Sequence, residues 1–149
     1  MRRYGFAFIV GLSFISITVA QQGFNLYPGA KLDEVLTKAE RAFLTESIKE
    51  GAPLPKGQQV TLYSTPDDFD KVCNFYRGII KEFERGRFSS KLSEGQKFRS
   101  AIFIFDGAAD TQKSKSWIRI QRPYIPEDEV GEDNPKVHDI TVITHYEIK

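Results

Sequence analysis

Three kinds of side chain in this sequence could do chemistry: one cysteine, two histidines and a cluster of acids. Cys73 is the only cysteine, so it could act as a nucleophile but cannot form an intramolecular disulfide. It lies beside Val72 and Tyr76 in a run of apolar residues at helical spacing. Such surroundings disfavour the thiolate that nucleophilic attack requires, and a buried free cysteine behaves as a small hydrophobic residue. We therefore expect Cys73 to be a core residue rather than a catalytic thiol.

The histidines and acids could bind a metal, but their spacing argues against it. His138 and His145 are seven residues apart, so on one strand they point to opposite faces. A zinc site would need further ligands from elsewhere in the chain. The five acids between residues 127 and 133 could offer oxygen ligands to calcium. They lack the alternating D-x-[DN]-x-[DN]-G pattern that places ligands around one ion, so we expect a solvated loop, no metal site and no cofactor.

Motifs of the common enzyme classes are missing, and surplus aromatic residues point instead to binding. The sequence has no G-x-S-x-G, no Walker loop and no G-x-G-x-x-G, which argues against an enzyme. Tyr27, Phe75, Trp117 and Tyr124 lie outside the main apolar stripes. Aromatic rings are common in partly solvated binding sites, although these four side chains could also pack between loops and the sheet. Tyr27, Trp117 and Tyr124 are our candidate binding residues.

The first twenty residues have the layout of a secretory signal peptide. Arg2 and Arg3 precede an apolar run over residues 6–19, and the small residue Ala20 follows it. The run is shorter than the ~20 apolar residues of a spanning helix, which favours cleavage over a retained membrane anchor. No cysteine stands at the predicted cleavage point, where Gln21 follows Ala20, so we expect no bacterial lipid anchor. The sequence predicts a signal peptide over residues 1–20 and a single domain over residues 21–149.

The net charge limits the classes of partner that we expect, and the cysteine content limits the cellular compartment. The chain has 21 basic and 20 acidic side chains, and loss of Arg2 and Arg3 leaves 19 basic and 20 acidic, a net charge of −1. A near-neutral domain predicts no binding to nucleic acid or to anionic membranes. An exported chain without a disulfide fits the bacterial periplasm better than a disulfide-stapled module. We expect a periplasmic or secreted protein with no membrane span after signal cleavage.

Apolar spacing predicts two helices and about four strands. The first helix follows Asp33 as N-cap and the second covers residues 66–83, with Ser64 or Thr65 as N-cap. The first carries an apolar stripe formed by Val35, Leu36, Ala39, Ala42 and Phe43. Alternating patterns predict strands over residues 59–63, 98–105, 117–121 and 139–148, and a short strand near Phe88. The order α-β-α-β-β-β predicts an α+β fold: an antiparallel sheet of about four strands with the helices packed on one face.

Three segments of the domain together resemble a known sequence pattern. They are Tyr27–Asp33 (YPGAKLD), Thr65–Arg77 (TPDDFDKVCNFYR) and Ile118–Tyr124 (IRIQRPY). The chain resembles an uncharacterised family of small exported bacterial proteins with a YPGAKLD-like start, a TxDxxxxVxxFYR-like helix and an IQxP strand end. The resemblance covers most of residues 21–149 and implies export and an α+β domain, but no activity and no functional residues. The acidic segment 127–135 departs from the family pattern.

These observations predict an exported, non-catalytic domain that binds a protein or an envelope component. The alternative is a small-molecule-binding protein, or an unrecognised hydrolase, with a cleft between the first helix and the sheet. A concave pocket with convergent polar groups would favour the alternative. An exposed apolar patch would favour the first interpretation.

Overall fold

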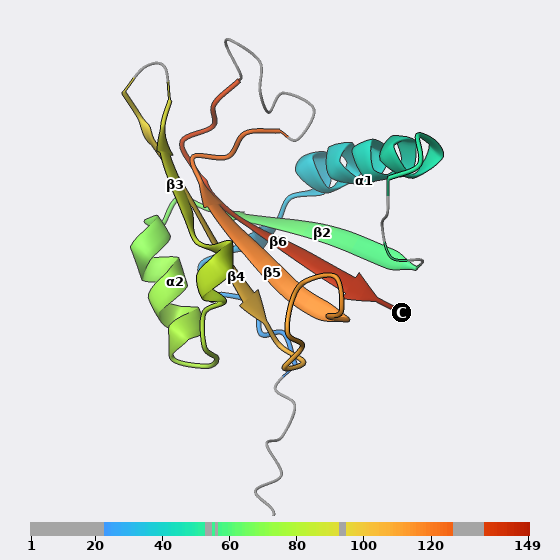
Figure 1. Ribbon diagram of the computed structural model, residues 1–149. Helices are drawn as coiled ribbons and strands as arrows, with labels where there is room; N and C mark the ends of the chain where they lie inside the picture. The colour runs from blue at the N-terminus through green and yellow to red at the C-terminus, as the bar shows by residue number, and fades with distance from the viewer. Residues whose placement is uncertain (1–22, 53–54, 56, 93–94, 127–135) are drawn as a thin grey trace, which may run out of the picture.

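The fold is an α+β domain built on one antiparallel sheet (Figure 1). The computed structural model describes residues 23–52, 55, 57–92, 95–126 and 136–149. The predicted signal peptide and the acidic cluster of residues 127–133 lie outside the described residues. Within the described part of the chain, no helix is long and apolar enough to cross a membrane.

The sheet has six strands in the order β1-β2-β6-β5-β4-β3, and all neighbours are antiparallel. Sequence patterns predicted the four long strands and a short one near Phe88, but not β1. The two short strands form the edges of the sheet, where short strands are common because they limit edge-to-edge pairing. Two residues are too few to show an alternating pattern, which is why β1 was missed. The strands are β1 (Lys31–Leu32), β2 (Gln58–Thr65), β3 (Phe88–Lys91), β4 (Lys97–Ile104), β5 (Ser116–Arg122) and β6 (Thr141–Ile148).

The two helices, α1 (Glu34–Lys49) and α2 (Phe69–Arg77), pack against opposite faces of the sheet, so the expectation of helices on one face is wrong (Figure 1). Because side chains alternate along a strand, β6 points Ile143 to the α2 side and Val142 to the α1 side. Both faces of the central strands are therefore apolar, and each needs its own cover. The α2-side core contains Val72, Cys73, Tyr76, Ala101, Phe103, Ile118, Ile120 and Ile143. The α1-side core contains Val60, Leu62, Tyr124, Val142 and Tyr146.

Helix α2 is shorter than predicted because residues at both ends of the predicted helix pair with strands instead. Strand β2 runs on to Thr65, which pairs with Thr141, so the N-cap is Asp68 rather than Ser64 or Thr65. At the other end, the Phe83 N–H donates to the Ile102 carbonyl at 2.8 Å. This pairing with the edge of β4 needs extended backbone, so the helix ends at Arg77 instead of continuing to residue 83.

Candidate functional site

Cys73 lies in the core, as the sequence predicted. Helix α2 points its side chain at the sheet, where it is fully buried. Burial raises the pKa of the thiol to about 12, because the low-dielectric surroundings disfavour the thiolate. Cys73 therefore packs in the α2-side core as a small apolar residue.

The two histidines lie apart in the structure. His145 is partly buried on the α2 side, where its ring stacks on Phe24 with 4.1 Å between centroids. Its Nε2 lies 3.2 Å from the Ser116 hydroxyl, and burial lowers the pKa of the ring. His138 pairs through its backbone with Tyr124 beyond the end of β5. The described residues contain no group of three or more His, Cys, Asp or Glu that could hold a metal ion.

The candidate aromatic residues are divided between the two faces of the sheet. Tyr27 is buried on the α2 side, and its hydroxyl donates to Asp67 Oδ2 at 2.6 Å. Tyr124 is buried in the α1-side core, and Trp117 packs against that core, stacked on Tyr146 with 4.0 Å between centroids. The structure therefore brings Trp117 and Tyr124 to one face and leaves Tyr27 on the other.

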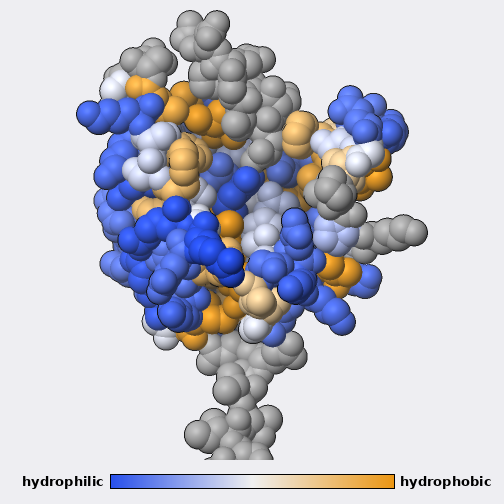
Figure 2. All heavy atoms as spheres, viewed as in Figure 1, coloured by the Kyte–Doolittle hydropathy of each residue, from blue (hydrophilic) through white to orange (hydrophobic). Residues whose placement is uncertain are grey.

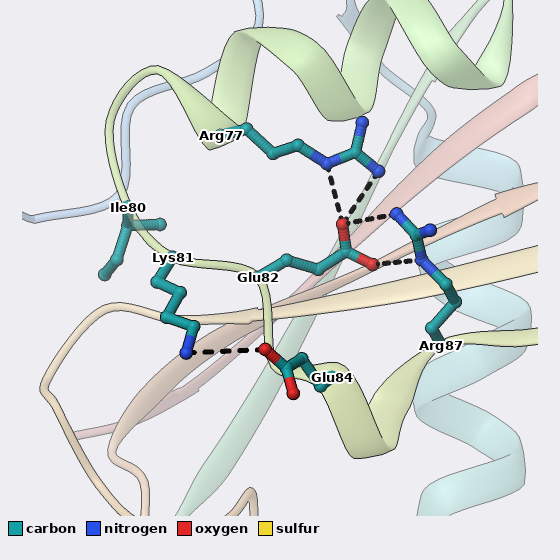
Figure 3. Close-up of a pocket in the computed structure, with 6 residues that line it drawn as sticks. All are labelled: Arg77, Ile80, Lys81, Glu82, Glu84 and Arg87. Atoms are coloured by element: carbon teal, nitrogen blue, oxygen red, sulfur yellow. Dashed lines mark hydrogen bonds and ion pairs between the residues drawn. The ribbon is translucent and has the colours of Figure 1, made fainter.

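A cavity of about 450 Å³ opens where the chain leaves α2 (Figure 3). Its centre is Glu82, whose carboxylate accepts hydrogen bonds from Arg77 Nε at 2.7 Å and from Arg87 Nε at 2.7 Å. Burial by itself would raise the pKa of Glu82, but the bonds from Arg87 and Arg77 outweigh it and hold that pKa below its ordinary value. The network ties the end of α2 to the segment before β3, and one carboxylate between two guanidiniums leaves one positive charge in excess.

Helix α1 is held to the sheet by polar side chains along the edge of β2. The Thr37 hydroxyl accepts from the Leu62 N–H at 2.9 Å and lies 3.3 Å from the Leu62 carbonyl, to which it donates. Further along the helix, Arg41 Nε donates to the Val60 carbonyl at 2.9 Å. These bonds replace a neighbouring strand and close an edge that would otherwise be open to pairing. Thr37 and Glu40 are the two buried side chains of the helix.

Four of the five residues of the predicted α1 stripe lie on the protein surface, whereas the fifth, Leu36, is partly buried and packs against the α1-side core. Val35, Ala39, Ala42 and Phe43 are all exposed, with Val35 79% and Phe43 36% exposed. Six large hydrophobic side chains are exposed among the described residues, and four of them, including Leu32 and Ile48, lie between residues 32 and 48. Figure 2 shows hydrophobic atoms at the surface where Figure 1 places α1. We call Val35, Ala39, Ala42 and Phe43 the α1 stripe.

Beside α1, the sheet face carries buried polar atoms. The Tyr146 hydroxyl donates to Glu40 Oε1 at 3.3 Å, and the Glu40 side chain is buried. Gln121 Oε1 and Thr144 Oγ1 are buried on the same face, and neither has a hydrogen-bond partner in the described part of the chain. A buried polar group without a partner costs about 1–3 kcal/mol, so each such group in a native fold needs an explanation.

Neither the exposed α1 stripe nor the buried polar atoms beside it could be read from the sequence, because both depend on contacts between distant segments. The helical spacing of the α1 stripe is readable, but its exposure follows from the bonds that Thr37 and Arg41 make to a distant strand. Gln121 lies on an interior strand at an alternating position, which is the one signal that could have marked it.

Comparison with protein-family models, curated proteins and solved structures finds no match for this chain. Export and the resemblance to a family of small exported bacterial proteins therefore stay predictions from the sequence.

Proposed function

We propose that this protein is an exported, non-catalytic domain that binds an envelope protein through the α1 stripe. The observation that supports the proposal is the exposed apolar stripe of α1. This helix turns Thr37, Glu40 and the partly buried Leu36 and Leu44 toward the sheet, and it presents Val35, Ala39, Ala42 and Phe43 to solvent. An amphipathic helix normally buries its apolar face, and contiguous exposed apolar surface marks interaction sites.

The spacing of the stripe specifies the kind of partner. Its residues fall at positions i, i+4, i+7 and i+8, the pattern of a helix that lies in an apolar groove of another protein. The side chains that hold α1 to β2, Thr37 and Arg41, lie on another side of the helix. A partner can therefore cover the stripe without detaching α1 from the sheet.

Two side chains of the α1 stripe can contribute most of the free energy of binding to a partner. Burying a valine or phenylalanine side chain fully contributes about 1.5–3 kcal/mol. Val35 is almost entirely exposed, whereas Phe43 is already partly covered and gains less. These two residues are the anchors, and the two alanines let the groove approach the helix closely.

Two substitutions at adjacent positions test the proposal. Ala39→Glu puts a charge in the stripe, whereas Lys38→Glu puts the same side chain at the next exposed position, about 100° around the helix. Extracts of the native envelope are separated by size without denaturant. We expect the wild type and Lys38→Glu to migrate in a complex and Ala39→Glu to migrate as the free protein. Equal migration of the two variants would contradict the proposal, as would a wild-type complex made only of copies of this chain.

A second candidate function rests on the buried polar atoms beside α1. Gln121 Oε1 and Thr144 Oγ1 could accept hydrogen bonds from a small polar ligand held between α1 and the sheet. Native mass spectrometry of the exported protein tests this candidate. A small-molecule adduct that is kept in Lys38→Glu and lost in Gln121→Leu would favour it over the first proposal, and a bare protein mass in all samples would refute it.

A further inference from the structure

At the sheet edge opposite α1, four cationic side chains face one another across three strands. Lys91 of β3 lies directly opposite Lys97 of β4, and Arg99 of β4 lies directly opposite Arg122 of β5. Lys97 and Arg99 are two residues apart on β4, so both pairs lie on the same face of the sheet. That face is the α2 side, because the Arg99 guanidinium lies over the Phe69 ring at 4.6 Å. Like charges at directly opposite positions destabilise a sheet.

Carboxylates balance only half of this charge. Arg99 Nη1 lies 2.7 Å from Asp70 Oδ2, and Arg122 Nη2 lies 3.1 Å from Asp139 Oδ1. Lys91 and Lys97 form no ion pair or hydrogen bond with any side chain in the described ranges. The cluster therefore keeps an excess of two positive charges.

A cavity of about 310 Å³ opens beside three of the four cationic side chains, Lys97, Arg99 and Arg122. The residues that line it are Gln96, Lys97, Arg99, Arg122, Pro123 and Asp139. Arg122 is fixed in place, since its Nη1 donates to the carbonyls of Pro66 at 3.0 Å and Asp67 at 2.9 Å. A guanidinium whose position is already set loses little further freedom when an anion binds.

We infer that this cavity is a binding site for a phosphate group. Inorganic phosphate or a phosphate monoester carries close to two negative charges at neutral pH, and the three cationic side chains that line the cavity exceed its one lining carboxylate, Asp139, by the same number. Arginine and lysine donors form short, charge-assisted hydrogen bonds to phosphate oxygens. A bound phosphate would also offset the charge of Lys97, which lines the cavity and has no carboxylate partner in the described ranges. The site is independent of the α1 stripe, which belongs to the other edge of the sheet.

The test is a titration of the exported protein with inorganic phosphate at constant ionic strength, followed by amide NMR shifts. We expect a saturable response centred on Lys97, Arg99 and Arg122. Lys97→Gln removes a charge without breaking a contact of the fold, and we expect it to weaken binding by about tenfold, the equivalent of 1.4 kcal/mol. The matched control, Lys38→Gln, removes the same charge from α1 and should leave the affinity unchanged.

A second arm identifies the source of the phosphate. Sedimentation with phosphatidylglycerol vesicles, but not with phosphatidylcholine vesicles, and its reversal by inorganic phosphate would assign the site to a lipid headgroup. Saturable phosphate binding without sedimentation would assign it to a soluble phosphate ester. Both outcomes support the site. Equal loss of affinity in Lys97→Gln and Lys38→Gln, or no saturable shift up to about 10 mM phosphate, would overturn it.

Discussion

The substitution Thr→Val should have opposite effects on folding stability at positions 37 and 144. Both threonines are buried, but their hydroxyls differ in what they contact. The Thr37 hydroxyl bonds to both backbone groups of Leu62, whereas Thr144 Oγ1 has no hydrogen-bond partner among the residues that the structure describes. Valine has nearly the shape of threonine and lacks the hydroxyl, so each substitution mainly removes that group.

The magnitudes follow from which polar groups are left without a partner. In Thr37→Val the Leu62 carbonyl still accepts from the Asp33 N–H at 2.9 Å, but the Leu62 N–H is left buried and unpaired. That loss should cost about 1–3 kcal/mol, and helix propensity does not offset it because valine and threonine rank together. Thr144→Val removes an unpaired hydroxyl, which should raise stability by about 1 kcal/mol. Both effects are large against a total of about 5–15 kcal/mol.

Urea melts of the two variants decide the matter, with unchanged m-values required so that midpoints report stability. We expect the midpoint of Thr37→Val to fall and that of Thr144→Val to rise. A neutral Thr37→Val would refute the attachment of α1 to the edge of β2. A Thr144→Val variant that loses stability would show that the hydroxyl is hydrogen-bonded, and it would weaken the case for a polar ligand beside α1.

Three further predictions concern other parts of the fold. Cys73→Ala should cost about 1 kcal/mol in urea melts, and rapid labelling of native Cys73 by a thiol reagent would contradict its burial. Burial holds the pKa of folded His145 below its unfolded value of 6.5, so stability is full above about pH 6.5 and falls as the pH is lowered toward the folded pKa. Ring-proton NMR should show this lowered pKa, and His145→Gln should remove the part of the pH dependence of the urea midpoint that begins near pH 6.5. Lys97→Glu should raise stability by about 0.2–1 kcal/mol by pairing with Lys91, and a loss of stability would contradict the like-charge repulsion.

Features set by neighbouring residues were predictable from the sequence. Asp33 caps α1 as expected, with its side chain accepting from the Leu36 N–H at 3.0 Å, because capping involves only the first turn. The four long strands alternate as predicted. The short α2 was not predictable, since its ends depend on Thr141 and Ile102, residues far along the chain.

The candidate sites were less predictable, because both depend on pairing between distant segments. A net charge of −1 for residues 21–149 gave no sign of the cationic cluster. Lys91 and Lys97 become neighbours only in the register of β3 with β4, and Arg122 joins Arg99 only through β5. The exposure of the α1 stripe depends likewise on the bonds from Thr37 and Arg41 to β2.

The most direct test of partner binding through α1 is site-specific photo-crosslinking in the native envelope. A photoreactive phenylalanine analogue is placed at Ala39, within the stripe, or at the adjacent exposed Lys38. We expect the residue 39 probe to give one defined adduct with a different protein and the residue 38 probe to give none. Adducts of equal yield from both positions, or no adduct from residue 39, would contradict the proposal that α1 lies in the groove of a partner.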